Sequence, residues 1–364
     1  MPLPGKTLSQ MLNLVAGTQK KIVRKKWIGS QALQNYEPAT TLLDAAKGDA
    51  SGTGWQKNMH MAANTGATYT YDFYSPVVVQ KAPAQKVLTL AQWAKYENAG
   101  LRFDLEEKRQ NMGDPEQIVD IMQAERETNN EDIAQKFATD LQGIGQSGPT
   151  DLNTMFGLRY YARRSQSSGT YVANTSGGFT GQELTWADGS GNSTTVLGLD
   201  ASDVSNERLR NFTITHDGSM NLTTAQKVHL MLRRIRFRPF KNRKGEVSTG
   251  SDSLFLSQLF EDQYIDMVND GPDDRDGDLF PFTTTTLAGV EIKSVPLWDS
   301  VTEQPIIALR GNGLQISYAP GAWFTESKPY MTSHREMYIA TNCTGQLLPR
   351  VAPRECIGIC HGSF

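Results

Sequence analysis

The sequence DPEQIVDIMQAERETNNEDIAQKFATDLQG, residues 114–143, decides the fold. Asp114 is placed to cap the first turn of a helix, and Pro115 follows at the first helical position, where its missing N–H costs nothing. Gly143 can adopt the left-handed conformation that often ends a helix. These signals predict one helix over residues 115–142, about 40–45 Å long at roughly 1.5 Å per residue. A compact globular core rarely needs so long a rod.

The apolar side chains of this helix form two clusters at helical spacing, one near each end. They are the expected anchors of the helix: Ile118 and Met122 near its start, and Ile133, Phe137 and Leu141 near its end. Between them, residues 123–132 are almost wholly polar. We therefore expect a helix that is anchored at both ends and exposed or lightly packed in its middle. It is either a long surface helix of an ordinary domain or a strut across a thin, plate-like protein.

The chain has 364 residues, enough for two or three domains or one elaborated domain. Its 38% of hydrophobic residues predicts a soluble protein that can form a core. The formal net charge of −3 does not by itself indicate a partner. No apolar run approaches the ~18 residues of a membrane span. The N-terminal residues lack the pattern of a secretory signal, so we expect a protein that is made and used in a cytoplasm, without a membrane partner.

Chemistry-bearing motifs are scarce. The spacing C-x3-C-H at Cys356, Cys360 and His361 lacks the second ligand pair of a zinc site, so these residues and Cys343 are expected to be reduced thiols and a plain histidine. The chain has no H-E-x-x-H, no G-x-S-x-G and no Walker-type phosphate loop. The sequence therefore predicts no enzyme, no metal and no cofactor.

Two segments are strongly basic. The first lies in residues 1–54, which are expected to form an arm, and its cations are Lys20, Lys21, Arg24, Lys25 and Lys26. These residues either contact phosphates of DNA or belong to a solvated tail. The second, residues 233–244, is either a nucleic-acid surface or a charged flank that meets solvent or the acidic groups of a neighbouring copy.

Residues 55–100 change to the period of two that is typical of strands. Tyr69, Tyr71 and Phe73 alternate on one face, prolines interrupt the run, and Lys81 and Lys86 flank the expected tip. A long two-stranded hairpin has too little core to be stable alone. We therefore expect this hairpin to lie on a neighbouring copy of the same protein.

The remaining chain alternates short strands with two further helices. Helices are expected over residues 220–237 and 251–269, and residues 149–218 are turn-rich. Strands are expected over residues 101–105, 289–297, 306–309, 314–318 and 336–341.

This order of parts resembles the major capsid protein of tailed bacteriophages, the Hong Kong 97-type fold. Residues 103–113, FDLEEKRQNMG, are similar to the strand and "RQN-G" run that precede the spine helix in that family, and residues 140–158 are similar to the run that follows it. Residues 289–292 and 345–348 resemble late strands of the family. Residues 208–211, RLRN, stand where many members carry "W-R-N", without the tryptophan. The resemblance extends over roughly residues 55–355.

The resemblance implies an α+β fold with four parts. Residues 1–54 would be an N-terminal arm and residues 55–100 the extended β-hairpin loop. Residues 101–147 and 325–364 would form the peripheral domain around the spine helix, and residues 148–324 the axial domain. The loop residues Tyr69, Tyr71, Phe73, Lys81 and Lys86 would contact a neighbouring subunit, and the basic arm would face DNA in the lumen.

The implied function is structural. Copies of the chain would assemble into pentamers and hexamers, and these into an icosahedral shell that encloses double-stranded DNA in the virion of a tailed phage. Assembly would take place in the cytoplasm of the host bacterium, with portal protein and with scaffolding or decoration proteins as further partners. Two alternatives remain: a compartment shell of the encapsulin type, and a nucleic-acid-binding protein that uses the basic arm.

Overall fold

The computed structural model describes slightly more than half of the chain, and all structural statements below concern these residues. They are residues 38–43, 48, 54–60, 85–90, 93–104, 115–143, 154–162, 195–200, 204–209, 211–236, 252–269, 286–302, 304–311, 313–328, 330–331 and 336–362. Within them, no helix combines the length and the apolar character needed to cross a lipid bilayer.

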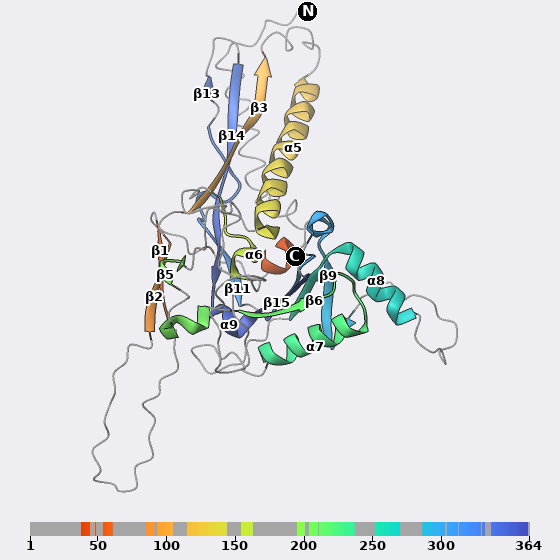
Figure 1. Ribbon diagram of the computed structural model, residues 1–364. Coiled ribbons are helices and arrows are strands. Elements are labelled where there is room, and N and C mark those ends of the chain that lie inside the picture. The colour runs from red at the N-terminus through yellow and green to blue at the C-terminus, as the bar shows by residue number, and fades with distance from the viewer. Residues whose placement is uncertain are drawn as a thin grey trace, which may run out of the picture.

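One long strand organises the first layer, a five-stranded sheet. It is β14 (Glu336–Pro349), which pairs antiparallel with four other strands: β3 (Ala94–Asp104), β11 (Leu314–Tyr318), β12 (Thr325–Glu326) and β13 (Tyr330–Met331). Helix α5 (Pro115–Gln142) runs alongside β3 and β14 (Figure 1). The predicted helix over residues 115–142 is therefore confirmed. The sheet and α5 together are called the wall below.

The second layer is a six-stranded mixed sheet, the axial sheet below. Its strands lie in the order β6 (Phe212–His216), β15 (Ile357–Gly362), β10 (Ile306–Leu309), β7 (Ser253–Leu256), β9 (Val290–Ser294) and β8 (Thr286–Leu287). Helix α7 (Leu222–Arg236) packs on β6 and β15, and α8 (Gln258–Asn269) lies near β9. The three adjacent strands β15, β10 and β7 are fully buried, which suits their mostly apolar sequences.

The remaining elements of the described residues are short. The strand pairs are β1 (Trp55–His60) with β2 (Gln85–Leu90), and β4 (Thr195–Val196) with β5 (Leu199–Asp200). The short helices are α3 (Ala39–Leu43), α6 (Leu158–Tyr161), α9 (Pro353–Cys356) and the 3-10 helices at Val204–Leu209 and Pro296–Ser300.

The structure corrects the helix predicted over residues 251–269. Its first part is strand β7, and only residues 258–269 are helical. All four residues of β7 are buried, and such a short apolar run cannot be assigned to strand or helix by periodicity. The strand predicted over residues 289–297 is also too long, because Pro296 begins a 3-10 helix. Strands β10 and β11 have the predicted bounds, whereas β3 and β14 are longer than predicted.

Strand pairing also crosses the boundaries that the resemblance implied for the domains. Strand β15 falls in the segment assigned to the peripheral domain, yet it hydrogen-bonds between β6 and β10 in the axial sheet. Strand β11 falls in the segment assigned to the axial domain, yet it pairs with β14 in the wall. Strand β3 begins at Ala94, inside the segment assigned to the extended loop. Sequence order alone does not reveal such exchanges, because they depend on non-local pairing.

The C-terminal half of α5 is anchored by buried apolar side chains. Ile133, Phe137 and Leu141 are spaced by four residues, so they share one face of the helix, and all three are buried. The ring of Phe137 packs edge-on against Tyr96 and Trp323, each with a centroid separation of 5.6 Å. The side chains of Ile118 and Met122 lie outside the described part of α5.

We predict that Phe137→Ala lowers the free energy of unfolding by about 3–5 kcal/mol, because it opens a cavity between α5 and the wall sheet. Thr128→Ala, on the exposed side of the same helix, is the matched control and should change stability by no more than about 0.5 kcal/mol. Chemical denaturation of both variants measures the difference. Equal stability of the two variants would contradict the packing described here.

A buried histidine ends β6 at the margin of the axial sheet. The Gly218 N–H donates to Nδ1 of His216 (3.0 Å), so the ring proton is on Nε2 and is donated to the Gln304 carbonyl (3.1 Å). The ring also packs on Phe260, with a centroid separation of 5.0 Å. Burial lowers the pKa of His216 below its ordinary value. A second proton on the ring would remove the acceptor that the Gly218 N–H uses.

We predict that stability falls in acid because of His216. With its pKa lowered in the fold, its contribution is complete above the unfolded value of about 6.5 and decreases as the pH drops below it, by at most about 1.4 kcal/mol per pH unit. Unfolding of the full chain between pH 8 and pH 5 tests this. His216→Asn keeps an acceptor near Nδ1 without titrating, so its pH slope should be shallower; an unchanged slope would contradict the assignment.

Candidate assembly surfaces

The middle of α5 is held to the wall by polar contacts. Arg126 and Asn129 are one turn apart on the inner face of the helix, and both are buried. The Arg126 guanidinium forms an ion pair with Glu326 (Nε to Oε1, 3.2 Å), and Asn129 Nδ2 donates to Thr341 Oγ1 (3.0 Å). The expectation of an exposed or lightly packed middle is therefore wrong for this face.

The partners of these two side chains are themselves adjacent. Glu326 of β12 and Thr341 of β14 are register partners across the antiparallel pair. The two contacts of α5 therefore reach neighbouring positions on neighbouring strands. A shift of the helix along the sheet would leave the buried guanidinium without its carboxylate, which is costly. This polar layer fixes the position of α5 on the wall.

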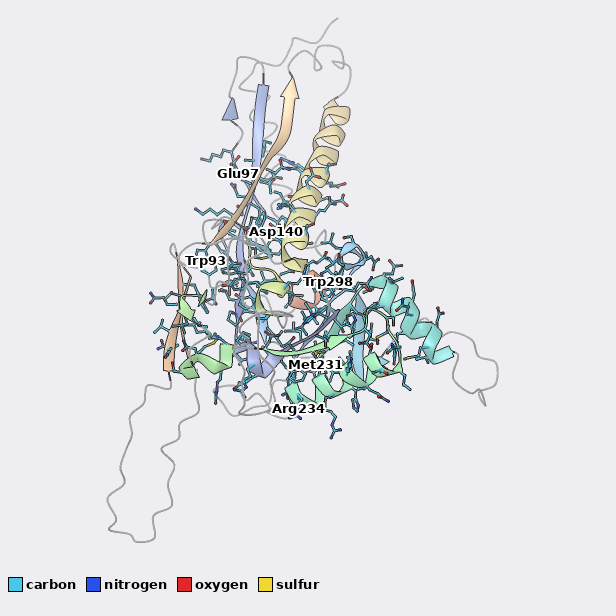
Figure 2. The ribbon with its side chains drawn as sticks, in the orientation of Figure 1. Trp93, Glu97, Asp140, Met231, Arg234 and Trp298 are labelled. Carbon is cyan, nitrogen blue, oxygen red and sulfur yellow. The ribbon has the colours of Figure 1, made fainter. Side chains whose placement is uncertain are left out.

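A second polar cluster lies about two to three turns after Asn129 along α5. The Tyr96 hydroxyl donates to Asp140 Oδ2 (2.8 Å) and accepts from the Met155 N–H (3.1 Å). Lys136 forms an ion pair with the other carboxylate oxygen of Asp140 (3.0 Å). Burial and the Asp140 charge raise the pKa of Tyr96, so the hydroxyl stays protonated and keeps donating. Figure 2 labels Asp140 on the side of α5 that faces the sheet.

The wall and the axial sheet meet at the end of α5. Trp298, from the 3-10 helix after β9, is almost fully buried, and its indole N–H donates to the carbonyl of Gln142 (3.0 Å). This carbonyl is one of those that have no partner within the helix at a C-terminus. Figure 2 shows Trp298 between the lower end of α5 and the axial sheet. The contact joins the two layers into one unit.

The base of the predicted extended loop is a two-stranded ladder formed by β1 and β2. Two hydrogen bonds link β2 to other parts of the chain. Lys86 Nζ donates to the Ser205 hydroxyl, and the Thr89 N–H donates to the Leu197 carbonyl (3.0 Å). Lys57 Nζ also donates to the Arg350 carbonyl (3.0 Å). The ladder is thus attached to the body of its own subunit at the base. The predicted contact residues Tyr69, Tyr71, Phe73 and Lys81 lie outside the described residues.

The two predicted basic segments differ in how much of them the structure describes. The cations of the arm, Lys20, Lys21, Arg24, Lys25 and Lys26, lie outside the described residues. In the second segment, Arg233 and Arg234 are exposed on α7. Figure 2 shows Arg234 on the side of α7 that points away from the sheet.

The three thiols are buried and free of disulfides. Burial raises the pKa of Cys343 and of Cys360 to about 12 each, and it raises the pKa of Cys356 as well. Protonated, buried thiols are poor nucleophiles and poor metal ligands. The described part of the chain contains no group of three or more histidine, cysteine or carboxylate side chains that could hold a metal ion.

Sequence reasoning missed the polar layer and Trp298. A weak signal for the first was available, since Arg126, Asn129 and Ile133 continue the spacing of the apolar face through the polar stretch. Their partners Glu326 and Thr341 are about 200 residues away, and no local pattern points to them. Trp298 follows a proline in a short turn, which gives no indication of its contact with α5.

We predict that Arg126→Met lowers the free energy of unfolding by about 3 kcal/mol or more, because it leaves the Glu326 carboxylate buried without its cation. The double variant Arg126→Met/Glu326→Leu should recover a large part of this loss. A double-mutant cycle with Glu326→Leu alone, measured by chemical denaturation, gives the coupling energy. If the two single changes add within about 0.5 kcal/mol, the pair is not coupled.

Comparison with known proteins identifies the fold. No protein-family model and no curated protein matches the chain significantly. The capsid asymmetric unit of cyanophage A-1(L) matches with a TM-score of 0.55 and 13% identity, over 88% of this chain and 91% of that one. The native GTA particle capsid (TM-score 0.49, 9% identity, 92% and 90% covered) and the SrpI encapsulin of Synechococcus elongatus PCC 7942 (0.49, 8%, 90% and 88%) also match. The chain therefore has the α+β Hong Kong 97-type fold of tailed-phage capsid proteins.

Proposed function

We propose that the chain is the major capsid protein of a tailed bacteriophage. Copies of it assemble into pentamers and hexamers, and these form an icosahedral shell around double-stranded DNA. The observation that carries the proposal is the match to the cyanophage A-1(L) capsid, which spans 88% of this chain and 91% of the other. A match of this extent includes the wall and the axial sheet together, whereas a shared small module would cover only one of them.

The internal contacts support a role as a building block. The polar layer fixes α5 on the wall, and the hydrogen bond between Trp298 and Gln142 attaches the wall to the axial sheet. A subunit that is ordered before it meets its neighbours loses less conformational entropy on association. The exposed apolar residues, Val87, Leu222, Leu230, Leu259, Val268 and Leu297, provide area that contacts between copies would bury.

The proposal also assigns partners and a location. The extended loop contacts a neighbouring subunit through Tyr69, Tyr71, Phe73 and Lys81, whereas Lys86 binds Ser205 of its own chain. The basic residues of the arm, Lys20 to Lys26, face DNA in the lumen. Portal protein and scaffolding or decoration proteins complete the particle, which assembles in the host bacterial cytoplasm and persists as the virion. The role is structural, without catalysis or a cofactor.

We predict that the purified full-length chain forms rings or closed shells that are visible by electron microscopy, because assembly buries the surfaces described above. Size-exclusion chromatography over a wide range of protein and salt concentrations gives the solution state. A strictly monomeric chain without particles would overturn the proposal.

Two other outcomes would point to the alternatives. Shells that co-purify with a protein cargo and without DNA would indicate a compartment of the encapsulin type. Monomers or dimers that bind DNA with a steep salt dependence, and form no particles, would indicate a nucleic-acid-binding protein.

A further inference from the structure

Two helices lie toward opposite ends of the axial sheet. Helix α7 packs on β6 and β15, which form one end of the strand order, whereas α8 lies against β9 and the 3-10 helix Pro296–Ser300 at the other end. Figure 1 shows the two helices on different sides of the sheet. Their outer faces are therefore separate surfaces of one subunit.

The outer face of α7 is basic around one leucine. Val228, Met231 and Ile235 are buried against the sheet, whereas Leu230 is 43% exposed. Arg233 and Arg234 follow Leu230 by three and four residues, so they extend the same outer face, and both are exposed. In Figure 2, Met231 lies on the sheet side of α7 and Arg234 on the outer side.

The outer face of α8 has the opposite charge around a similar leucine. Phe260 and Tyr264 are buried, whereas Leu259 is 45% exposed. Asp262 and Asp266 follow Leu259 by three and seven residues and are exposed along the same face. On each outer face, two exposed charges of one sign thus follow an exposed leucine.

Within the described residues, none of these four charges forms an ion pair. Among the described residues, the ion pairs involve other side chains: Arg126 with Glu326, Lys136 with Asp140, Arg208 with Glu355, Lys227 with Asp217, and Lys293 with Glu291. The pair of arginines on α7 and the pair of aspartates on α8 are therefore available to a partner.

We infer that the acidic outer face of α8 in one copy docks on the basic outer face of α7 in the next copy. The contact places Leu259 near Leu230, and Asp262 and Asp266 near Arg233 and Arg234. A second copy is the partner that satisfies both faces at once, whereas the phosphates of a nucleic acid would be repelled by α8. Because the two faces differ and lie apart, the contact is head-to-tail and can close into rings. This inference rests on the proposed function, and it identifies the surfaces through which the copies would form rings.

A charge exchange in the full-length chain tests the contact. Arg233→Glu/Arg234→Glu makes both outer faces acidic, and Asp262→Lys/Asp266→Lys makes both basic. Each variant should lose rings and shells, or need at least about a tenfold higher protein concentration to form them, because like charges now meet. The four changes in one chain restore opposite charges and should restore assembly. Native mass spectrometry and electron microscopy record the products, and thermal unfolding checks that each variant folds.

Mixing the two double variants gives a result that general surface damage cannot produce. Acidic copies can then contact only basic copies, so a ring must alternate and must contain an even number of subunits. The mixture should form six-membered rings and no five-membered rings, whereas the four-residue exchange should form both.

The outcomes separate the inference from the proposed function. If the unchanged chain forms no rings or shells, the proposed function fails. If it does form them, the inference is overturned when either double variant assembles as well as the unchanged chain, or when the four-residue exchange assembles no better than the double variants. Loss of bound DNA with assembly intact would also overturn it, and would assign α7 to nucleic acid.

Discussion

A long helix with a polar middle stays on a sheet only if its inward polar groups find partners there. In α5 the buried guanidinium of Arg126 meets the carboxylate of Glu326, and Asn129 meets Thr341 on the neighbouring strand. Apolar packing could hold the helix in several positions of similar energy, but a buried charge has one acceptable position. The arrangement of the wall therefore depends on this pair of contacts more than on any single apolar contact.

The rest of the subunit extends from that fixed helix. The last turns of α5 carry Phe137 and Asp140 into the body of the wall, and the carbonyl of Gln142 accepts a hydrogen bond from the indole N–H of Trp298. The axial sheet then presents α7 and α8 outward in a constant relation to the spine. Rings and shells require such constancy, because a small angular error at each contact accumulates around a ring.

The sequence was informative where structure is local. Caps, proline and glycine placed α5, and the spacing of Ile133, Phe137 and Leu141 identified its buried face. The helix predicted over residues 251–269 is wrong at β7, because a run of four buried residues fits a strand or a helix equally well. No local pattern indicated the partner of Arg126, which comes from a strand about 200 residues away. The pairing of β15 with β6 and β10 also depends on segments far apart in the chain. Order along the chain suggested the fold, but only long-range pairing defines which strand belongs to which sheet.

The place of β15 in the axial sheet has a consequence for the time at which the subunit matures during synthesis. The ribosome makes β6, β7 and β10 long before residues 357–362, yet β15 lies between β6 and β10 and forms part of the surface on which α7 packs. A nascent chain that lacks β15 has two open strand edges and an unsupported α7. Pairing between such distant segments is also slow. The axial sheet is thus completed only when residues 357–362 have been synthesised, and α7 gains its full support at that point.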